Sequence, residues 1–150
     1  MKPPLSKHFM KLTGAAAVVV LLAGTLFIRR ETARTEQWQS LENLVQGVPL
    51  APPPELATEA GVCAGLGAAG EQTGHVRLAN GEVWRFAFRS HHLIDGEESY
   101  SVFTGPGGSY RVRGDYFCCE VEIPDDAVPK DGAEFVAFLR SEHPLVERMP

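Results

Sequence analysis

The sequence predicts an α+β fold: an N-terminal transmembrane helix, then a small antiparallel β-meander of about five strands packed by one or two helices. Three observations support this prediction. An uncharged apolar run, Leu12 to Ile28, lies between Lys11 and Arg29. From Thr73 onward, apolar residues recur with a period of two, which is typical of half-buried strands. Near the C-terminus, an Asp-Gly-Ala-Glu sequence precedes apolar residues at helical spacing, which is typical of a capped helix.

The apolar run has the length and the flanks of an uncleaved membrane anchor. A spanning helix needs about 17 to 25 apolar residues, and residues 12–28 meet the lower limit. The Arg29-Arg30 pair that follows is typical of the membrane–water interface. A cleaved secretory signal is the alternative, but apolar residues continue beyond its best small-residue exit, Ala23-Gly24-Thr25. Leu21 to Gly24 resembles a bacterial lipobox, but the next residue, Thr25, lacks the thiol that would carry the lipid.

The basic residues near the run predict its orientation. Three lie on each side, and the amino terminus adds a charge that favours a cytoplasmic N-terminus. We therefore expect residues 1–11 to be a cytoplasmic tail, residues 12–28 a single-pass anchor in the cell membrane, and the C-terminal domain to lie outside the cytoplasm. The expected partners are the lipid bilayer and a protein in the membrane.

Charge is distributed unevenly along the chain. Residues 1–50 carry six Lys/Arg and three Asp/Glu, a net +3, and residues 51–150 carry eight and sixteen, a net −8, which together give the total of −5. A nucleic-acid-binding domain needs a basic surface patch. The acidic C-terminal part therefore argues against nucleic acid as a partner.

Residues 29–47 predict a juxtamembrane amphipathic helix. Its apolar residues recur at helical spacing and form the candidate contact surface for a protein partner: Trp38, Leu41, Leu44 and Val45. The alternative for Trp38 is packing on the chain's own domain. Gly47 is a suitable C-terminal stop.

Residues 48–54, VPLAPPP, predict a proline-rich linker, because successive prolines impose an extended, stiff chain. Its expected role is to hold the domain of residues 55–150 away from the helix or the bilayer. Within that domain we expect a short helix from Pro54 to about Leu66, with proline in its first turn.

Asn80-Gly81 predicts the first hairpin. A two-residue loop would split the apolar residues between the two faces. A three-residue loop, 79–81, pairs Leu78 with Glu82 and Val76 with Trp84, so that the even-numbered apolar residues share one face. We therefore predict the three-residue loop, with Gly81 in the left-handed conformation.

A second hairpin, residues 99–104 with 109–113, is expected around Gly105 to Gly108, with Tyr100 and Val102 facing Tyr110 and Val112 across the two strands. A fifth strand, Tyr116 to Ile123, alternates cleanly, so we expect one face of the sheet to be solvated. A helix is expected from the Asp131 cap to about Glu142. Pro144 and Pro150 argue against much structure in the tail.

The three cysteines, Cys63, Cys118 and Cys119, leave one unpaired thiol or an intermolecular bond outside the cytoplasm. A bridge from Cys63 to the adjacent pair and free thiols are both open. The polar loop residues His91-His92 and the adjacent cysteines lack zinc-ligand spacing, and there is no C-x-x-C motif. We therefore expect no catalytic, cofactor-binding or metal-binding residues, and no cofactor.

This architecture predicts a membrane-anchored interaction domain, a structural or accessory subunit of a membrane complex, rather than an enzyme. An apolar helix that continues into an amphipathic one, followed by a meander with late cysteines, resembles pilin architecture and implies a pilin-like or secretion-apparatus component. The resemblance covers topology; the pilin signature of Gly followed by Phe-Thr-Leu does not occur before Leu12. A secreted or periplasmic thiol, redox or enzyme domain, released by signal cleavage, is the third alternative.

Overall fold

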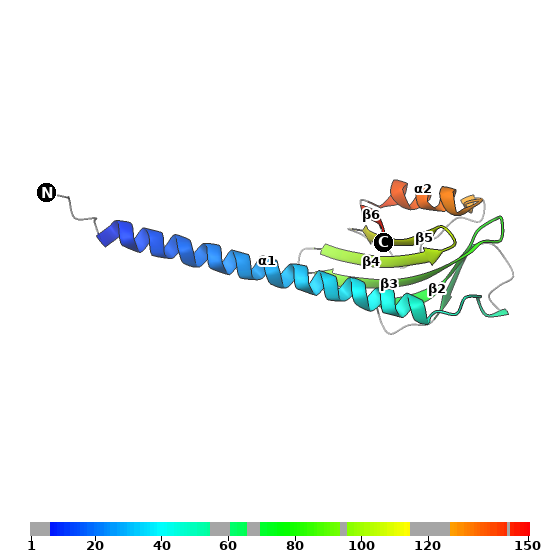
Figure 1. Ribbon diagram of the computed structural model, residues 1–150, viewed down its shortest axis with the longest axis horizontal. Helices are drawn as coiled ribbons and strands as arrows, with labels where there is room; N and C mark the ends of the chain where they lie inside the picture. The colour runs from blue at the N-terminus through cyan, green and yellow to red at the C-terminus, as the bar shows by residue number, and fades with distance from the viewer. Residues whose placement is uncertain (1–6, 55–60, 66–69, 94–95, 115–126, 144) are drawn as a thin grey trace. The chain divides into compact units, whose positions relative to one another are not determined.

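The computed structural model describes residues 7–54, 61–65, 70–93, 96–114, 127–143 and 145–150. The side chains of residues 7–15, 62–65, 91–93, 96 and 97 lie outside this description. The chain divides into two compact units, Met1–Gln37 and Trp38–Pro150. Helix α1, Lys7–Gly47, contributes to both units (Figure 1).

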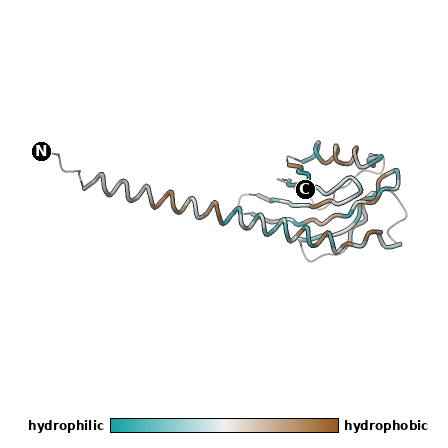
Figure 2. The backbone as a smooth tube through the Cα atoms, viewed as in Figure 1, coloured by the Kyte–Doolittle hydropathy of each residue, from teal (hydrophilic) through white to brown (hydrophobic). Residues whose placement is uncertain are grey.

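In the first unit, α1 carries large apolar side chains that are exposed: Val18, Val19, Val20, Leu21, Leu22, Leu26, Phe27 and Ile28. Figure 2 shows this stretch of the helix mostly in brown, followed by a more hydrophilic stretch in teal. Thr25, Thr32 and Thr35 donate their hydroxyls to the carbonyl four residues earlier, so these polar groups are satisfied within the helix. Among the residues that the structure describes, no helix is both long enough and apolar enough to cross a bilayer.

The second unit contains an antiparallel sheet whose described strands follow one another in chain order, β1 to β6. Their bounds are β1 Gly61–Gly65, β2 Glu71–Arg77, β3 Val83–Leu93, β4 Gly96–Gly105, β5 Gly108–Gly114 and β6 Leu145–Arg148. Helix α2, Gly132–Glu142, lies between β5 and β6 in the chain. The predicted α+β fold with an antiparallel meander is confirmed.

Both faces of this sheet are covered. One core cluster joins α2 to even-numbered residues of β2 and β3, and includes Val76, Trp84, Phe135 and Leu139. The other joins the end of α1 to the opposite face, and includes Leu41, Val45, Ala87, Tyr100 and Val102. Figure 1 shows α2 and the cyan end of α1 on opposite sides of the strands. A helix therefore buries apolar side chains on each face of the described strands, whereas the strand 116–123, whose alternation predicts a solvated face, lies outside the described residues.

The first hairpin has the predicted register. Val76 lies opposite Trp84, and the Leu78 amide donates to the Glu82 carbonyl at 2.8 Å. Gly81 has a φ of +89°, a conformation that favours glycine. The shared burial of the even-numbered apolar residues fixes this loop length, because a shift of one residue would turn each of them to the other face.

The second hairpin has a different register from the predicted one. Gly105 pairs with Gly108, so the connection has two residues, and Phe103 lies opposite Tyr110. Tyr110 and Val112 therefore lie in the α2 cluster, whereas Tyr100 and Val102 lie in the α1 cluster. Sequence alternation did not reveal this, because both faces of β4 carry apolar residues and each one is buried.

The two outermost strands correct the sequence predictions. Residues 61–65, expected at the end of a helix from Pro54 to about Leu66, form β1 paired with β2; Gly61 has a φ of +128°, outside the helical region. The tail, expected to lack structure, forms β6 along β5. Both segments gain backbone hydrogen bonds at a sheet edge, which outweighs weak local preferences. The predicted strand 116–123 and residues 55–60 lie outside the described residues.

Helix α2 begins at the predicted cap. The Asp131 carboxylate accepts hydrogen bonds from the amides of Ala133 and Glu134 at 2.9 and 3.0 Å. Glu134 accepts from the amide of Lys130 at 2.9 Å, one residue before the position of the standard capping box. The helix buries Phe135, Val136 and Leu139.

Replacing Asp131 with Ala removes both side-chain acceptors from the first turn of α2. We expect Asp131→Ala to lower the free energy of unfolding by about 1 kcal/mol, the usual loss for an N-cap. Asp131→Asn is the matched control, because its amide oxygen keeps the cap. Urea unfolding of the three chains measures the effect, and equal midpoints for Asp131→Ala and the unchanged chain would contradict it.

Candidate functional site

The apolar residues of α1 that were predicted to contact a protein partner pack on the chain's own sheet: Trp38, Leu41, Leu44 and Val45. Leu41 and Val45 are 0% and 1% exposed, in contact with the cluster of Ala87, Tyr100 and Val102. Trp38 and Leu44 are half-buried and pack against the same cluster. For Trp38 this is the alternative stated above, packing on the chain's own domain. These side chains are therefore a structural interface within the second unit.

Two arginines of the sheet, Arg111 and Arg89, bind polar residues of α1 at this interface. Arg111 of β5 donates from Nε to Glu42 Oε1 at 2.8 Å, and its Nη2 forms an ion pair with the same carboxylate. Arg89 of β3 donates from Nε to Glu71 Oε2 at 3.1 Å and from Nη2 to Ser40 Oγ at 3.2 Å. Arginine suits such sites because its planar fork donates to more than one acceptor. The pairs fix which part of α1 lies over which strands.

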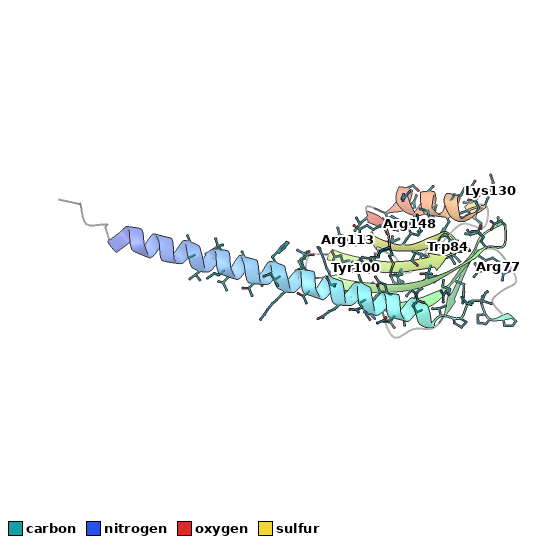
Figure 3. All side chains as sticks on the ribbon, viewed as in Figure 1. Arg77, Trp84, Tyr100, Arg113, Lys130 and Arg148 are labelled. Carbon is teal, nitrogen blue, oxygen red and sulfur yellow. The ribbon has the colours of Figure 1, made fainter. Side chains whose placement is uncertain are left out.

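Trp38 contacts both an aromatic ring and a cation. Its ring meets Tyr100 edge-on, with centroids 4.9 Å apart, and the Arg111 guanidinium carbon lies 5.6 Å from the ring centroid. Tyr100 donates its hydroxyl to Glu98 at 2.7 Å. Figure 3 labels Tyr100, and Arg113 lies opposite it across β4 and β5. Such edge-on and cation–π contacts stabilise packing by about 0.5 to 1.5 kcal/mol each.

The proline-rich segment begins against the sheet. The Val48 carbonyl accepts from Arg85 Nη1 at 3.1 Å, and the Pro49 carbonyl accepts from His75 Nε2 at 2.8 Å. Because a carbonyl can only accept, the Nε2 of His75 is the donor in this hydrogen bond. Val48 is buried. The first two residues of the segment 48–54 therefore bind the sheet directly through their carbonyl groups. The segment does not hold the domain away from the end of α1, because the end of α1 packs on the same sheet.

Sequence reasoning missed the polar half of this interface. Arg85 and Arg89 alternate with apolar residues, a pattern that favours solvent exposure, yet both bind groups on or just after α1. One signal was present: Ala87, between them on the same face, is small enough for a helix to approach closely, and it is fully buried. The long-range pairing of Glu42 with Arg111 had no local signal.

The cysteines and histidines do not form a described site. Cys63 lies on β1 opposite His75, and Cys118 and Cys119 lie outside the described residues. His91 and His92, expected in a loop, lie on β3 opposite Glu98 and Glu97 of β4. No group of three or more His, Cys, Asp or Glu in the described part of the chain is placed to hold a metal ion.

The remaining candidate surface is the exposed apolar part of α1, from Val18 to Ile28. Successive residues of an α-helix are about 100° apart, so Val18, Val19, Val20 and Leu21 together surround the helix axis. Their exposed fractions are 55, 64, 70 and 70%. A helix that is apolar all round is typically surrounded by apolar material on every side. A groove on one protein partner would cover only part of this surface.

His143, the C-cap of α2, is the described group with a shifted pKa. Burial lowers its pKa below the ordinary value, and the neighbouring Glu142 carboxylate partly offsets this. The unfolded chain therefore binds this proton more readily than the folded chain. The contribution to stability is present above about pH 6.5 and is lost as the pH falls through the unfolded and then the folded pKa.

We therefore expect the free energy of unfolding to fall between pH 7.5 and 5.5, and to fall less in His143→Gln, which has no titratable ring. Urea unfolding at the two pH values measures the difference. An equal or larger fall in His143→Gln would show that the His143 pKa is not lowered by folding.

Comparisons of the chain with models of protein families, with curated proteins and with solved structures give no match.

Proposed function

We propose that the chain is a single-pass membrane protein, anchored by residues 12–28, whose α+β domain lies outside the cytoplasm. In this role it is a structural or accessory subunit of a membrane complex. The observation that carries the proposal is the ring of exposed apolar side chains from Val18 to Leu21, which continues to Leu26, Phe27 and Ile28. A lipid environment covers all sides of such a helix at once.

Polar groups at the ends of the run support the same function. The described part from Ala16 to Ile28 contains no charge, and Thr25 satisfies its hydroxyl at Leu21. Lys11 precedes the run and Arg29-Arg30 follows it, as is typical of residues at the two interfaces. The side chains of Leu12 to Ala15 belong to the proposed anchor and lie outside the described residues.

Alkaline carbonate extraction of membranes from expressing cells tests the anchor. We expect the full chain to stay in the pellet, and the variant V20K/L22K to be released, because each lysine at the centre of a span costs about 2.5 to 3.5 kcal/mol. Leu50→Lys is the matched control, since Leu50 is an exposed leucine outside the run. Release of the unchanged chain, or equal retention of all three, would contradict the anchor.

Protease added to the outer face of sealed cells tests the orientation. We expect cleavage within the C-terminal domain while the chain remains membrane-bound. Mild detergent extraction and native-gel sizing then test the accessory role: the chain should migrate in a complex with a second protein. A monomer that co-purifies with no other protein would contradict that role.

A pilin-like or secretion-apparatus component is the second candidate. The observation that favours it is the unbroken helix Lys7–Gly47, whose last residues pack on an antiparallel sheet. In this function the exposed apolar part of α1 would contact the same part of other copies. Cross-linking between residues at position 22 of different copies distinguishes the two candidates: a ladder of oligomers favours the filament-type component, and a single heteromeric product favours the accessory subunit.

A further inference from the structure

We infer that Arg29 and Arg30 bind the phosphate groups of anionic phospholipids at the membrane surface. This inference rests on the proposed anchor and names the lipid class that the anchor contacts. The two residues follow directly after Ile28, the last residue of the exposed apolar run. In a helix whose apolar run lies in the hydrocarbon, their guanidinium groups lie at the level of the lipid headgroups.

The two guanidinium groups have no acidic partner in the described part of the chain. Both residues are exposed, and none of the described ion pairs includes them. Glu31, the residue that follows Arg30 in the chain, accepts from Arg34 Nη1 at 3.1 Å. Because Arg34 holds this carboxylate, the net charge of the Arg29-Arg30 pair stays available to an external anion.

Other polar groups nearby are already satisfied. Thr32 donates its hydroxyl to the Ile28 carbonyl at 2.9 Å, and Thr35 donates to the Glu31 carbonyl at 2.9 Å. This part of the helix therefore offers two arginine forks and few competing donors. A guanidinium fork matches a phosphate with two parallel N–H donors, which favours phosphate over other headgroup atoms.

The C-terminal part of the chain is acidic, so it does not supply the attraction to anionic lipid that we assign to Arg29 and Arg30. Residues 51–150 carry a net charge of −8, from eight basic and sixteen acidic residues. Such a domain is repelled by an anionic surface. A preference for anionic lipid on that side must then come from basic residues next to the anchor.

Electron spin resonance with spin-labelled lipids tests the inference on the full chain in vesicles of phosphatidylcholine with a minor fraction of phosphatidylglycerol. We expect the chain to associate with labelled phosphatidylglycerol more than with labelled phosphatidylcholine. In R29Q/R30Q we expect this preference to fall by up to about fivefold per arginine at low salt. The lysines before the run are unchanged in all variants, so their contribution cancels in the comparison.

The matched control is E31Q/R34Q, which removes an internal ion pair and leaves the net charge unchanged. It should keep the preference of the unchanged chain, and added salt should weaken that preference. Equal preference in R29Q/R30Q and the unchanged chain would overturn the lipid inference alone, provided that both stay membrane-bound after carbonate washing. If the unchanged chain is not membrane-bound, the proposed anchor and this inference both fail.

Discussion

A chain that begins at Val48 will not fold, whereas a chain that begins at Trp38 will. The shorter chain loses Leu41 and Val45, which are 0% and 1% exposed, and each buried aliphatic side chain contributes about 1.5 to 3 kcal/mol. It also loses Glu42, the partner of Arg111. Because small domains are stable by about 5 to 15 kcal/mol, the summed loss is enough to leave most of the chain unfolded.

Circular dichroism and urea unfolding of the two truncated chains measure this effect. The chain 38–150 should show a cooperative transition, and 48–150 should show none, with Tyr100 and Val102 left uncovered. Adding the peptide 38–47 to the shorter chain should restore part of the signal. Equal unfolding midpoints for the two truncations would show that the end of α1 is not part of the domain.

A methyl group at Gly105 will destabilise the second unit severely. An ideal Cβ there would lie 2.2 Å from Cδ2 of Trp84, whereas carbon atoms pack at about 3.5 to 4.0 Å. Trp84 of β3, labelled in Figure 3, is fully buried and meets Phe135 of α2 edge-on, and a Cβ added at Gly107 or Gly132 would lie 3.4 or 3.0 Å from its ring. The added methyl group therefore forces either this buried ring or the backbone at residue 105 to shift.

We expect Gly105→Ala to lower the free energy of unfolding by about 3 kcal/mol, at the upper end of the usual cost of overpacking. The midpoint of thermal unfolding should fall by more than about 10 °C. Gly47→Ala is the matched control, because a Cβ there meets no atom within 4 Å, and alanine favours a helix. Unchanged thermal unfolding of Gly105→Ala would contradict the observed packing of Trp84.

Local patterns in the sequence were sufficient for some elements. The Asn80-Gly81 loop was predicted to the residue, because a single constraint, the shared burial of Val76 and Trp84, selects one loop length. The start of α2 was predicted from Asp131, because a cap acts within three residues. In both cases the deciding interactions lie close together in the chain.

Other elements depend on contacts between distant residues. The register of β4 and β5 depends on which face each helix covers, and β4 does not reveal this, because both of its faces carry buried apolar residues. The strands β1 and β6 depend on pairing at the sheet edges. The binding of Glu42 by Arg111 joins residues 69 positions apart, so the sequence could indicate an amphipathic helix but not the surface on which it packs.

The most direct test of the proposed anchor is the depth of residue 20, the centre of the run 12–28, in a bilayer. A fluorescent amino acid is placed at Val20, or at Glu36 as the control, in the full chain in vesicles. These positions are about 24 Å apart along a helix. We predict that lipids brominated at mid-chain quench the label at position 20 and that aqueous iodide quenches only the label at position 36. Equal quenching of both labels by iodide would contradict the anchor.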